Sequence, residues 1–91
     1  MAKKTVLLKS EDKRSLKEIA GFLRELADKI EANDLTLRQG KKEIKVSLPD
    51  PVVLELELEE KKKKKKGTKR QLEIEIEWYV GGKTQKSIKL G

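Results

Sequence analysis

This sequence has no cysteine and no histidine, and it holds only one Trp, one Tyr and one Phe. Without cysteine there is no disulfide framework, no thiol nucleophile and no thiolate zinc site. Without histidine there is no Ser-His-Asp triad and no imidazole ligand for a metal. No apolar run approaches the roughly 20 residues that a membrane-spanning helix needs. We therefore expect a small, soluble, cytoplasmic protein that is not an enzyme and holds no metal or cofactor.

The 91 residues are enough for one domain, and a chain of this size buries only about 60–65% of its unfolded surface. We expect a single domain over residues 1–91 with a modest core. Its net charge of +7 is local, because residues 61–70 hold eight basic groups and no acidic one. The basic groups are 19 Lys and only 4 Arg. Since the arginine fork is the side chain best suited to reading base edges, this composition does not favour sequence-specific nucleic-acid recognition.

One segment predicts an amphipathic helix. Ser15 and Glu18 fit a capping box, in which the Ser15 hydroxyl accepts from the Glu18 N–H and the Glu18 carboxylate accepts from the Ser15 N–H. Apolar residues then recur at helical spacing, at Leu16, Ile19, Ala20, Leu23, Leu26, Ala27 and Ile30. Asn33 is suited to end the helix as a left-handed cap.

After residue 34 the apolar spacing changes to two, which predicts strands. Pairing Leu58 with Leu72 keeps every apolar residue of those two strands on one face, as does pairing Leu37 with Ile44. Pairing Leu48 with Val52 around Pro49–Pro51 would join the two hairpins and place Lys45 opposite Glu55. Shorter runs at residues 5–9 and 87–90 predict a first and a last strand, the latter after a Gly81–Lys83 loop that sets Lys89 opposite Glu75.

These patterns predict an α+β fold. One amphipathic helix packs on one face of a four- to five-stranded antiparallel meander, in the order β-α-β-β-β-β with room for one more strand. Trp78 points into the core of this arrangement, and Tyr79 is an exposed ring. The lysine-rich residues 60–70 form a flexible hairpin loop.

The outward face of two neighbouring strands is acidic. In the register above, Glu57 faces Glu73 and Glu55 faces Glu75, and like charges directly opposite are mildly destabilising. A solvated face that discourages aggregation is one interpretation. A recognition face for a basic partner, including the lysines of a second copy, is another, and a divalent-cation site is a third. The candidate partner face consists of Glu55, Glu57, Glu73, Glu75, Glu77 and Tyr79.

The lysine run lies at the tip of the hairpin that joins those strands. It is either a solvated, self-repelling loop or a contact for a polyanion such as RNA, DNA or an acidic membrane surface. Phosphate contacts made by lysines alone give weak, sequence-independent, salt-sensitive binding. The candidate polyanion contacts are Lys61, Lys62, Lys63, Lys64, Lys65, Lys66, Lys69 and Arg70. The leading hypothesis is a non-enzymatic interaction module with a protein partner or a second copy, and a weak nucleic-acid binder is the alternative.

The catalytic motifs that the chain contains in part do not hold. Residues 80–84 include the Gly-Lys-Thr of a P-loop, but the glycine required five residues earlier is Glu77. The carboxylates are expected on an open sheet face, which is a poor place to raise a pKa for acid–base catalysis.

Two blocks resemble a known family. Residues 16–31 are similar to the first block of the amphi-Trp domain family, and residues 72–78 resemble its signature, an alternating charged and apolar strand that closes on a tryptophan. Residues 54–59 resemble the preceding strand, and the resemblance covers about residues 5–79. It implies a small prokaryotic protein without an established function, so no catalytic or binding residue is carried over from it.

Overall fold

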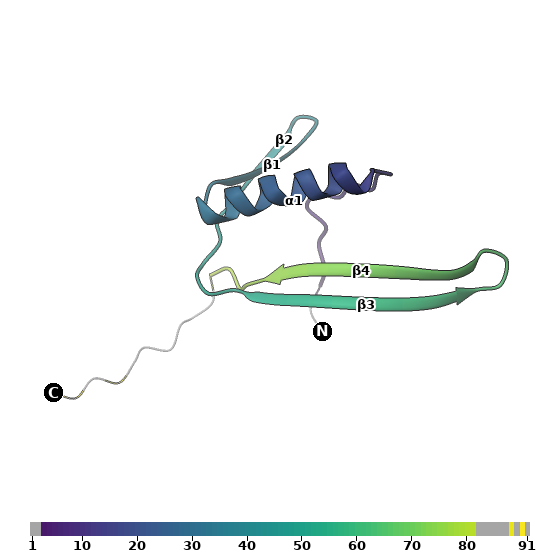
Figure 1. Ribbon diagram of the computed structural model, residues 1–91. Coiled ribbons are helices and arrows are strands. Elements are labelled where there is room, and N and C mark those ends of the chain that lie inside the picture. The colour runs from purple at the N-terminus through teal and green to yellow at the C-terminus, as the bar shows by residue number, and fades with distance from the viewer. Residues whose placement is uncertain (1–2, 82–87, 89, 91) are drawn as a thin grey trace. The chain divides into compact units, whose positions relative to one another are not determined.

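The computed structural model describes residues 3–81, 88 and 90, and the chain divides into two compact units, residues 1–48 and 49–91. The first unit holds helix α1 (Leu16–Glu31) and strands β1 (Leu35–Gln39) and β2 (Lys42–Val46). The second holds strands β3 (Val53–Lys63) and β4 (Gly67–Glu77) (Figure 1). Within the described residues the protein is therefore α+β with antiparallel strands, as predicted.

Helix α1 begins at Leu16 because Ser15 caps it. The Ser15 backbone is extended, and its Oγ accepts a hydrogen bond from the Glu18 N–H at 3.1 Å, which confirms the predicted N-cap. The other half of the capping box differs from the prediction. The Glu18 carboxylate accepts from the Ser15 hydroxyl at 3.1 Å, and its second oxygen lies 3.4 Å from Arg14 Nη1. The guanidinium thus holds the carboxylate that we expected to accept from the Ser15 N–H.

The helix ends in a Schellman motif at Asn33, whose φ of 50° is left-handed. The Asn33 N–H donates to the Ile30 carbonyl at 3.0 Å, and the Asp34 N–H donates to the Lys29 carbonyl at 2.9 Å. Asparagine visits this region more readily than most residues. The predicted left-handed cap is confirmed.

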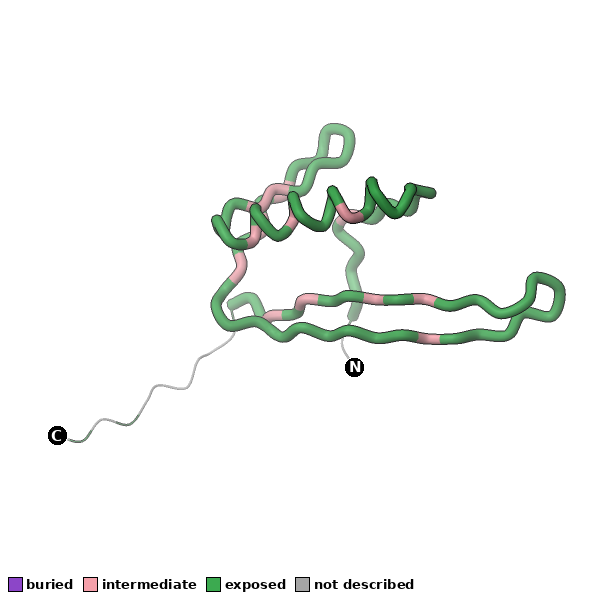
Figure 2. Tube along the Cα trace, in the orientation of Figure 1, coloured by how far each residue is buried: buried purple, intermediate pink, exposed green. Residues whose placement is uncertain are grey.

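Strands β1 and β2 form a hairpin in the predicted register, with Leu35 opposite Val46 and Leu37 opposite Ile44. Helix α1 packs against β1. The half-buried apolar residues of these elements gather where they meet, and they are Ala20, Leu26, Ile30, Leu35, Ile44 and Val46 (Figure 2). The N-terminal end of the helical stripe is open, since Leu16 is 85% exposed. The core of this unit is therefore smaller than the length of the stripe suggests.

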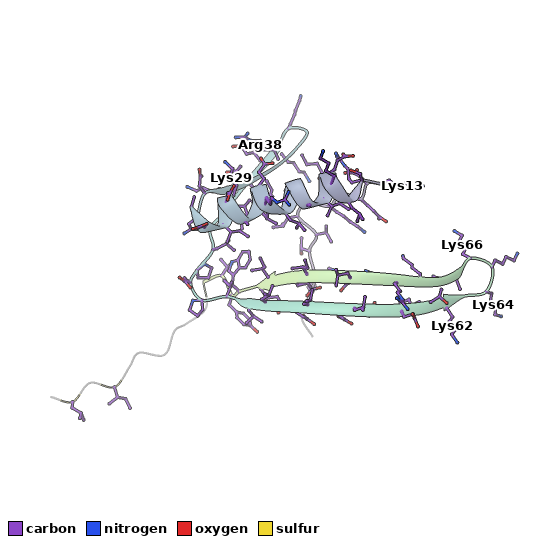
Figure 3. All side chains as sticks on the ribbon, viewed as in Figure 1. Lys13, Lys29, Arg38, Lys62, Lys64 and Lys66 are labelled. Carbon is purple, nitrogen blue, oxygen red and sulfur yellow. The ribbon has the colours of Figure 1, made fainter. Side chains whose placement is uncertain are left out.

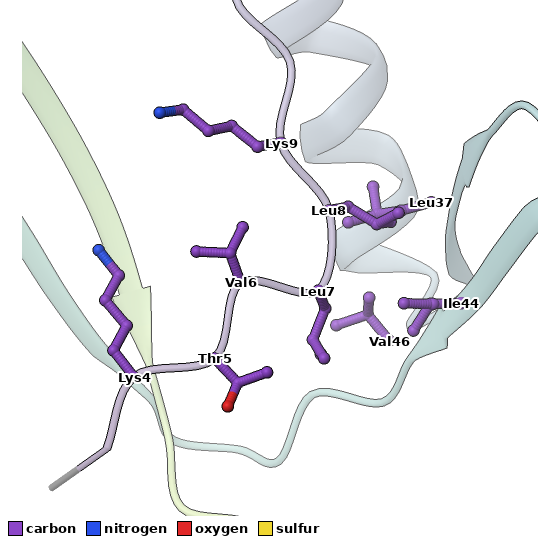
Figure 4. Close-up of a pocket in the computed structure, with 9 residues that line it drawn as sticks. All are labelled: Lys4, Thr5, Val6, Leu7, Leu8, Lys9, Leu37, Ile44 and Val46. Atoms are coloured by element: carbon purple, nitrogen blue, oxygen red, sulfur yellow. The ribbon is translucent and has the colours of Figure 1, made fainter.

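Residues 5–9, which we predicted as the first strand, form no strand. The chain bends at Leu7, which interrupts the straight extended run that a ladder of hydrogen bonds requires. One side-chain bond replaces the ladder, since Gln39 Nε2 donates to the Lys9 carbonyl at 2.7 Å. Leu8 is half-buried near Leu37 (Figure 4).

Strands β3 and β4 pair over eleven residues each, in the predicted register. The ladder continues to Lys63 opposite Gly67, so only Lys64–Lys66 form the connection, where we expected a loop over residues 60–70. An ion pair supports this extension, because Arg70 Nε lies 2.9 Å from Glu60 Oε1. Gly67 has a φ of 85°, which suits glycine at the end of the turn.

The described strands form two two-stranded sheets, β1–β2 and β3–β4, where we predicted one continuous meander. Leu48 does not pair with Val52, and Lys45 does not reach a position opposite Glu55 by strand pairing. Pro49 and Pro51 have no N–H to donate, so the connecting segment cannot extend a ladder.

The predictions for the C-terminal end are tested in part. The loop at 81–83, the strand at 87–90 and the position of Lys89 depend on residues outside the described ones. Trp78 is half-buried, whereas we expected it in the core. Strand β4 ends at Glu77, so Trp78 lies beyond the last residue that pairs with β3. Tyr79 is 95% exposed, as predicted.

Candidate functional site

The β3–β4 hairpin separates apolar from charged side chains by its register. Leucine and isoleucine occupy one face, where Leu56 pairs with Ile74, and glutamates occupy the other. The apolar face is open, with exposures of 68% for Leu54, 67% for Leu56 and 70% for Leu58. By contrast, Glu59 and Glu73 on the opposite side are half-buried, and Glu73 accepts a hydrogen bond from Gln71 Nε2. We call this opposite side, the odd-numbered residues of β3 and β4, the charged face.

Six glutamates of the charged face form what we call the acidic ladder: Glu55, Glu57, Glu59, Glu73, Glu75 and Glu77. Glu55 lies directly opposite Glu75, and Glu57 lies directly opposite Glu73. Cross-strand pairs of like charge are destabilising. The structure thus brings together the glutamates that sequence reasoning selected, in the register that it predicted.

Neighbouring carboxylates change each other's protonation. A hydrogen bond shared with Glu59, together with the negative charge of Glu59, raises the pKa of Glu57 above its ordinary value. A hydrogen bond shared with Glu75 raises the pKa of Glu77 in the same way. In both cases the protonated acid can donate to a carboxylate two residues away on the same face. The ladder therefore carries electrostatic repulsion that a proton or a cationic group would relieve.

Three carboxylates of the ladder converge. One oxygen each of Glu55, Glu75 and Glu77 lies within 4.8 Å of the others. All three side chains are exposed on an open sheet face. Calcium takes six to eight oxygen ligands, so three side chains of this kind leave most of its coordination to water. The geometry gives the cation hypothesis no support beyond the convergence itself.

The basic groups gather at the other end of the hairpin, in what we call the lysine tip: Lys61, Lys62, Lys63, Lys64, Lys65, Lys66, Lys69 and Arg70. Lys61 lies directly opposite Lys69. All of these side chains are exposed, and Lys62, Lys64 and Lys66 project away from the end of the hairpin (Figure 3). The backbone around the turn frames a shallow recess lined by residues 63–69. Since Arg70 is held by Glu60, the lysines supply the available charge.

Sequence reasoning missed one feature of the first unit. Residues 4–9 and the β1–β2 hairpin line an apolar recess, in which Leu7, Ile44 and Val46 lie close together (Figure 4). We predicted residues 5–9 as a first strand, whereas in the structure they line this recess. Their apolar composition was the only sequence signal for this role. The lining is mostly apolar, and its titratable residues are Lys4 and Lys9.

Comparison with known proteins gives one match. The family model described as Amphi-Trp domain matches residues 1–91. No curated protein and no solved structure matches the chain. In the part of the chain that the structure describes, α1 is too short and too polar to cross a membrane.

Proposed function

Because this chain belongs to the Amphi-Trp domain family, for which no activity guides the assignment, we propose from its charge distribution that it is a non-enzymatic interaction module. In this proposal the β3–β4 hairpin binds a partner through its charged face and its lysine tip. The observation that carries the proposal is the repulsion built into the hairpin. Glu57 faces Glu73 near the middle of the ladder, and Lys61 faces Lys69 closer to the turn.

Such pairs favour binding because a partner can remove an unfavourable interaction. Like charges directly opposite each other weaken a hairpin relative to a neutral pair. A partner that brings the opposite charge replaces this repulsion by attraction. Glu57, Lys61 and Lys69 are exposed and Glu73 is half-buried, so their charged groups reach a partner without rearrangement of the backbone. An open sheet face gives none of the burial that acid–base catalysis needs, which also favours binding over enzymatic activity.

Two short peptides test the proposal. Oligolysine probes the acidic ladder and oligoglutamate probes the lysine tip, and binding of each is followed by calorimetry at low salt. Replacing Glu57 and Glu73 by Gln should weaken oligolysine binding several-fold and leave oligoglutamate binding unchanged. Replacing Lys61 and Lys69 by Gln should do the reverse.

Matched controls lie on α1, where Glu25 and Glu31, or Lys17 and Lys29, are exposed. Their replacement by Gln changes the net charge of the protein by the same amount. If these control variants weaken binding as much as the hairpin variants do, net charge and not the hairpin determines binding, and the proposal is wrong.

A second candidate function is weak, sequence-independent polyanion binding. The clustering of eight basic groups around one turn, with one of them held in an ion pair, favours it. Generic RNA should then bind at low salt, and its affinity should fall with salt with a logarithmic slope of about −0.7 for each phosphate contacted. Replacing Lys61–Lys66 by Gln should abolish binding. Binding that does not respond to salt would exclude this function.

The second part of the proposal concerns how the helix and the β3–β4 hairpin pack. We propose that the apolar face of the hairpin packs against the apolar stripe of α1, which makes the two units one α+β domain with the helix on a sheet. Two-stranded hairpins are marginal on their own, which supports this packing. Leu56→Asp should then lower the melting temperature of the whole chain in a single cooperative transition. We also propose that the protein works in the cytoplasm, in keeping with a fold that uses no cysteine.

A further inference from the structure

The charged face of the hairpin is divided at one point. The charge of the face changes sign at the level of Glu60 and Arg70, which form an ion pair on the opposite, even-numbered face of the hairpin. Toward the start of β3 the face carries the acidic ladder. Toward the turn it carries Lys61, Lys63 and Lys69. The face therefore consists of an acidic half and a basic half that lie in line along the same two strands.

Such a face is complementary to itself when a second copy is turned end for end, as in an isologous dimer. A two-fold axis that crosses the hairpin at the level of Glu60 and Arg70, whose side chains point to the other face, sets each residue of the charged face against the one equally distant on the other side. Glu59 then faces the second copy's Lys61, and Glu57 faces its Lys63. By symmetry, the same two contacts form again with the copies exchanged.

The pairing on β4 is compatible with the same axis. Gln71 falls opposite the second copy's Lys69, and Glu73 falls opposite its Gly67. Glu75 and Glu55 both fall at the position of Lys65 in the turn of the second copy. Within the paired residues 53–63 and 67–77, no like charges of the charged face meet across the axis, although each hairpin contains like-charged pairs of its own.

We propose that the charged face of the β3–β4 hairpin binds the same face of a second copy of this chain, end for end, with the acidic half of each copy against the basic half of the other. This inference rests on the proposed function and names its partner. A polyanion would neutralise only the lysine tip, and a basic peptide would neutralise only the acidic ladder. A second copy relieves the repulsion at both ends in a single contact.

The geometry also predicts which contacts matter most. Two sheets packed face to face are rotated by about 30° because each sheet is twisted, so their strands diverge with distance from the axis. The pair of Glu59 with Lys61 lies nearest the axis and should contribute most. Exposed ion pairs are weak and screened by salt, so the dimer should weaken by about tenfold or more between low and high salt.

Charge-swapped variants test this proposal by sedimentation velocity. One variant carries Lys61→Glu, Lys63→Glu and Lys69→Glu, and the other carries Glu55→Lys, Glu57→Lys and Glu59→Lys. The wild-type chain should form a concentration-dependent dimer at low salt, and each variant alone should be monomeric. An equimolar mixture of the two variants should form a dimer again, because the acidic face of one then meets lysines at the same positions of the other.

The test needs a check of folding and a control variant on the first unit. Far-UV circular dichroism verifies that each variant is folded, and the corresponding Gln variants replace any that is not. A charge-matched change on the first unit, Lys13→Glu with Lys17→Glu and Lys29→Glu, should leave the dimer intact. A wild-type chain that stays monomeric at low salt overturns the inference, as does a mixture that fails to restore the dimer.

Three further outcomes separate this inference from the proposed function or overturn it. If the wild-type chain is monomeric but binds oligolysine through Glu57 and Glu73, the charged face binds a different partner, and only the second copy is excluded. If the chain neither dimerises nor binds either peptide, both proposals are wrong. A dimer that persists at high salt and in both variants would place the contact on the apolar face instead, and would also overturn the inference.

Discussion

Lys61 lies directly opposite Lys69 in the β3–β4 ladder, one step beyond the ion pair of Glu60 with Arg70. The two ammonium groups face the same side of the sheet and have no carboxylate between them in the register. A backbone ladder therefore continues through a position where the side chains repel. The Glu60–Arg70 ion pair favours this extension of the ladder, and the Lys61–Lys69 repulsion opposes it, which leads to the first prediction.

Replacing Lys61 by Glu should stabilise the monomer. The substitution turns a like-charged cross-strand pair into an opposite-charged one, which is worth about 0.2–1 kcal/mol. Chemical denaturation at low protein concentration measures the change, and Lys61→Gln should give a smaller gain of the same sign. A variant less stable than the wild-type chain would show that Lys61 and Lys69 do not repel each other.

The acidic ladder should make stability depend on pH. The raised pKa values of Glu57 and Glu77 mean that the folded state binds their protons more tightly than the unfolded chain does. This contribution is complete below the ordinary pKa of 4.5 and is lost as the pH rises through the raised values. The urea midpoint of the wild-type chain should therefore fall relative to a Glu57→Gln and Glu77→Gln variant as the pH rises from about 4 to about 7.

The control for that experiment is the pair Glu25→Gln and Glu31→Gln on α1. This variant removes two carboxylates that are not part of the acidic ladder. The difference between its urea midpoint and that of the wild-type chain should therefore change less over the same pH range. If the urea midpoint of the Glu57→Gln and Glu77→Gln variant changed with pH as that of the wild-type chain does, the interpretation that these carboxylates share protons would be contradicted.

Ser15→Ala should destabilise α1. The substitution removes the acceptor for the Glu18 N–H, and loss of an N-cap costs about 0.5–2 kcal/mol. The thermal melt followed at 222 nm measures the change. Ser10→Ala, an exposed serine before the helix, should change the melting temperature little. Equal effects of the two substitutions would exclude a capping role.

Asn33→Ala should also be destabilising, for a different reason. Alanine at a φ of 50° is strained by about 1–2 kcal/mol. Asn33→Gly relieves that strain but loses the acceptor for the Leu48 N–H, whose distance to Asn33 Oδ1 is 3.4 Å. The expected order of melting temperatures is therefore wild type and Gly above Ala. If Ala matched Gly, the left-handed cap would not contribute to stability.

Much of the local structure follows from the sequence because it depends on neighbouring residues. Ser15 and Asn33 bound the helix by hydrogen bonds that span only a few residues. Parity fixes the register of both hairpins, since a slip of one residue would reverse the faces. The composition of the acidic ladder and of the charged face could therefore be read from residue spacing alone.

Parity could not decide which strands pair across a longer connection. Parity allows Leu48 to face Val52. It does not take into account that Pro49 and Pro51, between them, have no N–H to donate to a ladder. The predicted loop bounds at the lysine tip were wrong because they were based on charge alone. The run of lysines indicated a loop, whereas backbone pairing and the Glu60–Arg70 contact carry the strands three residues further.

The central claim is that the charged face of the hairpin is a binding surface. The most direct measurement is a nitrogen-15 NMR titration of the wild-type chain with oligolysine at low salt, with amide shifts mapped residue by residue. The account predicts the largest shifts in residues 55–59 and 73–77, and little change in α1. Shifts of equal size in α1, or no shifts in the hairpin at saturating peptide, would contradict it.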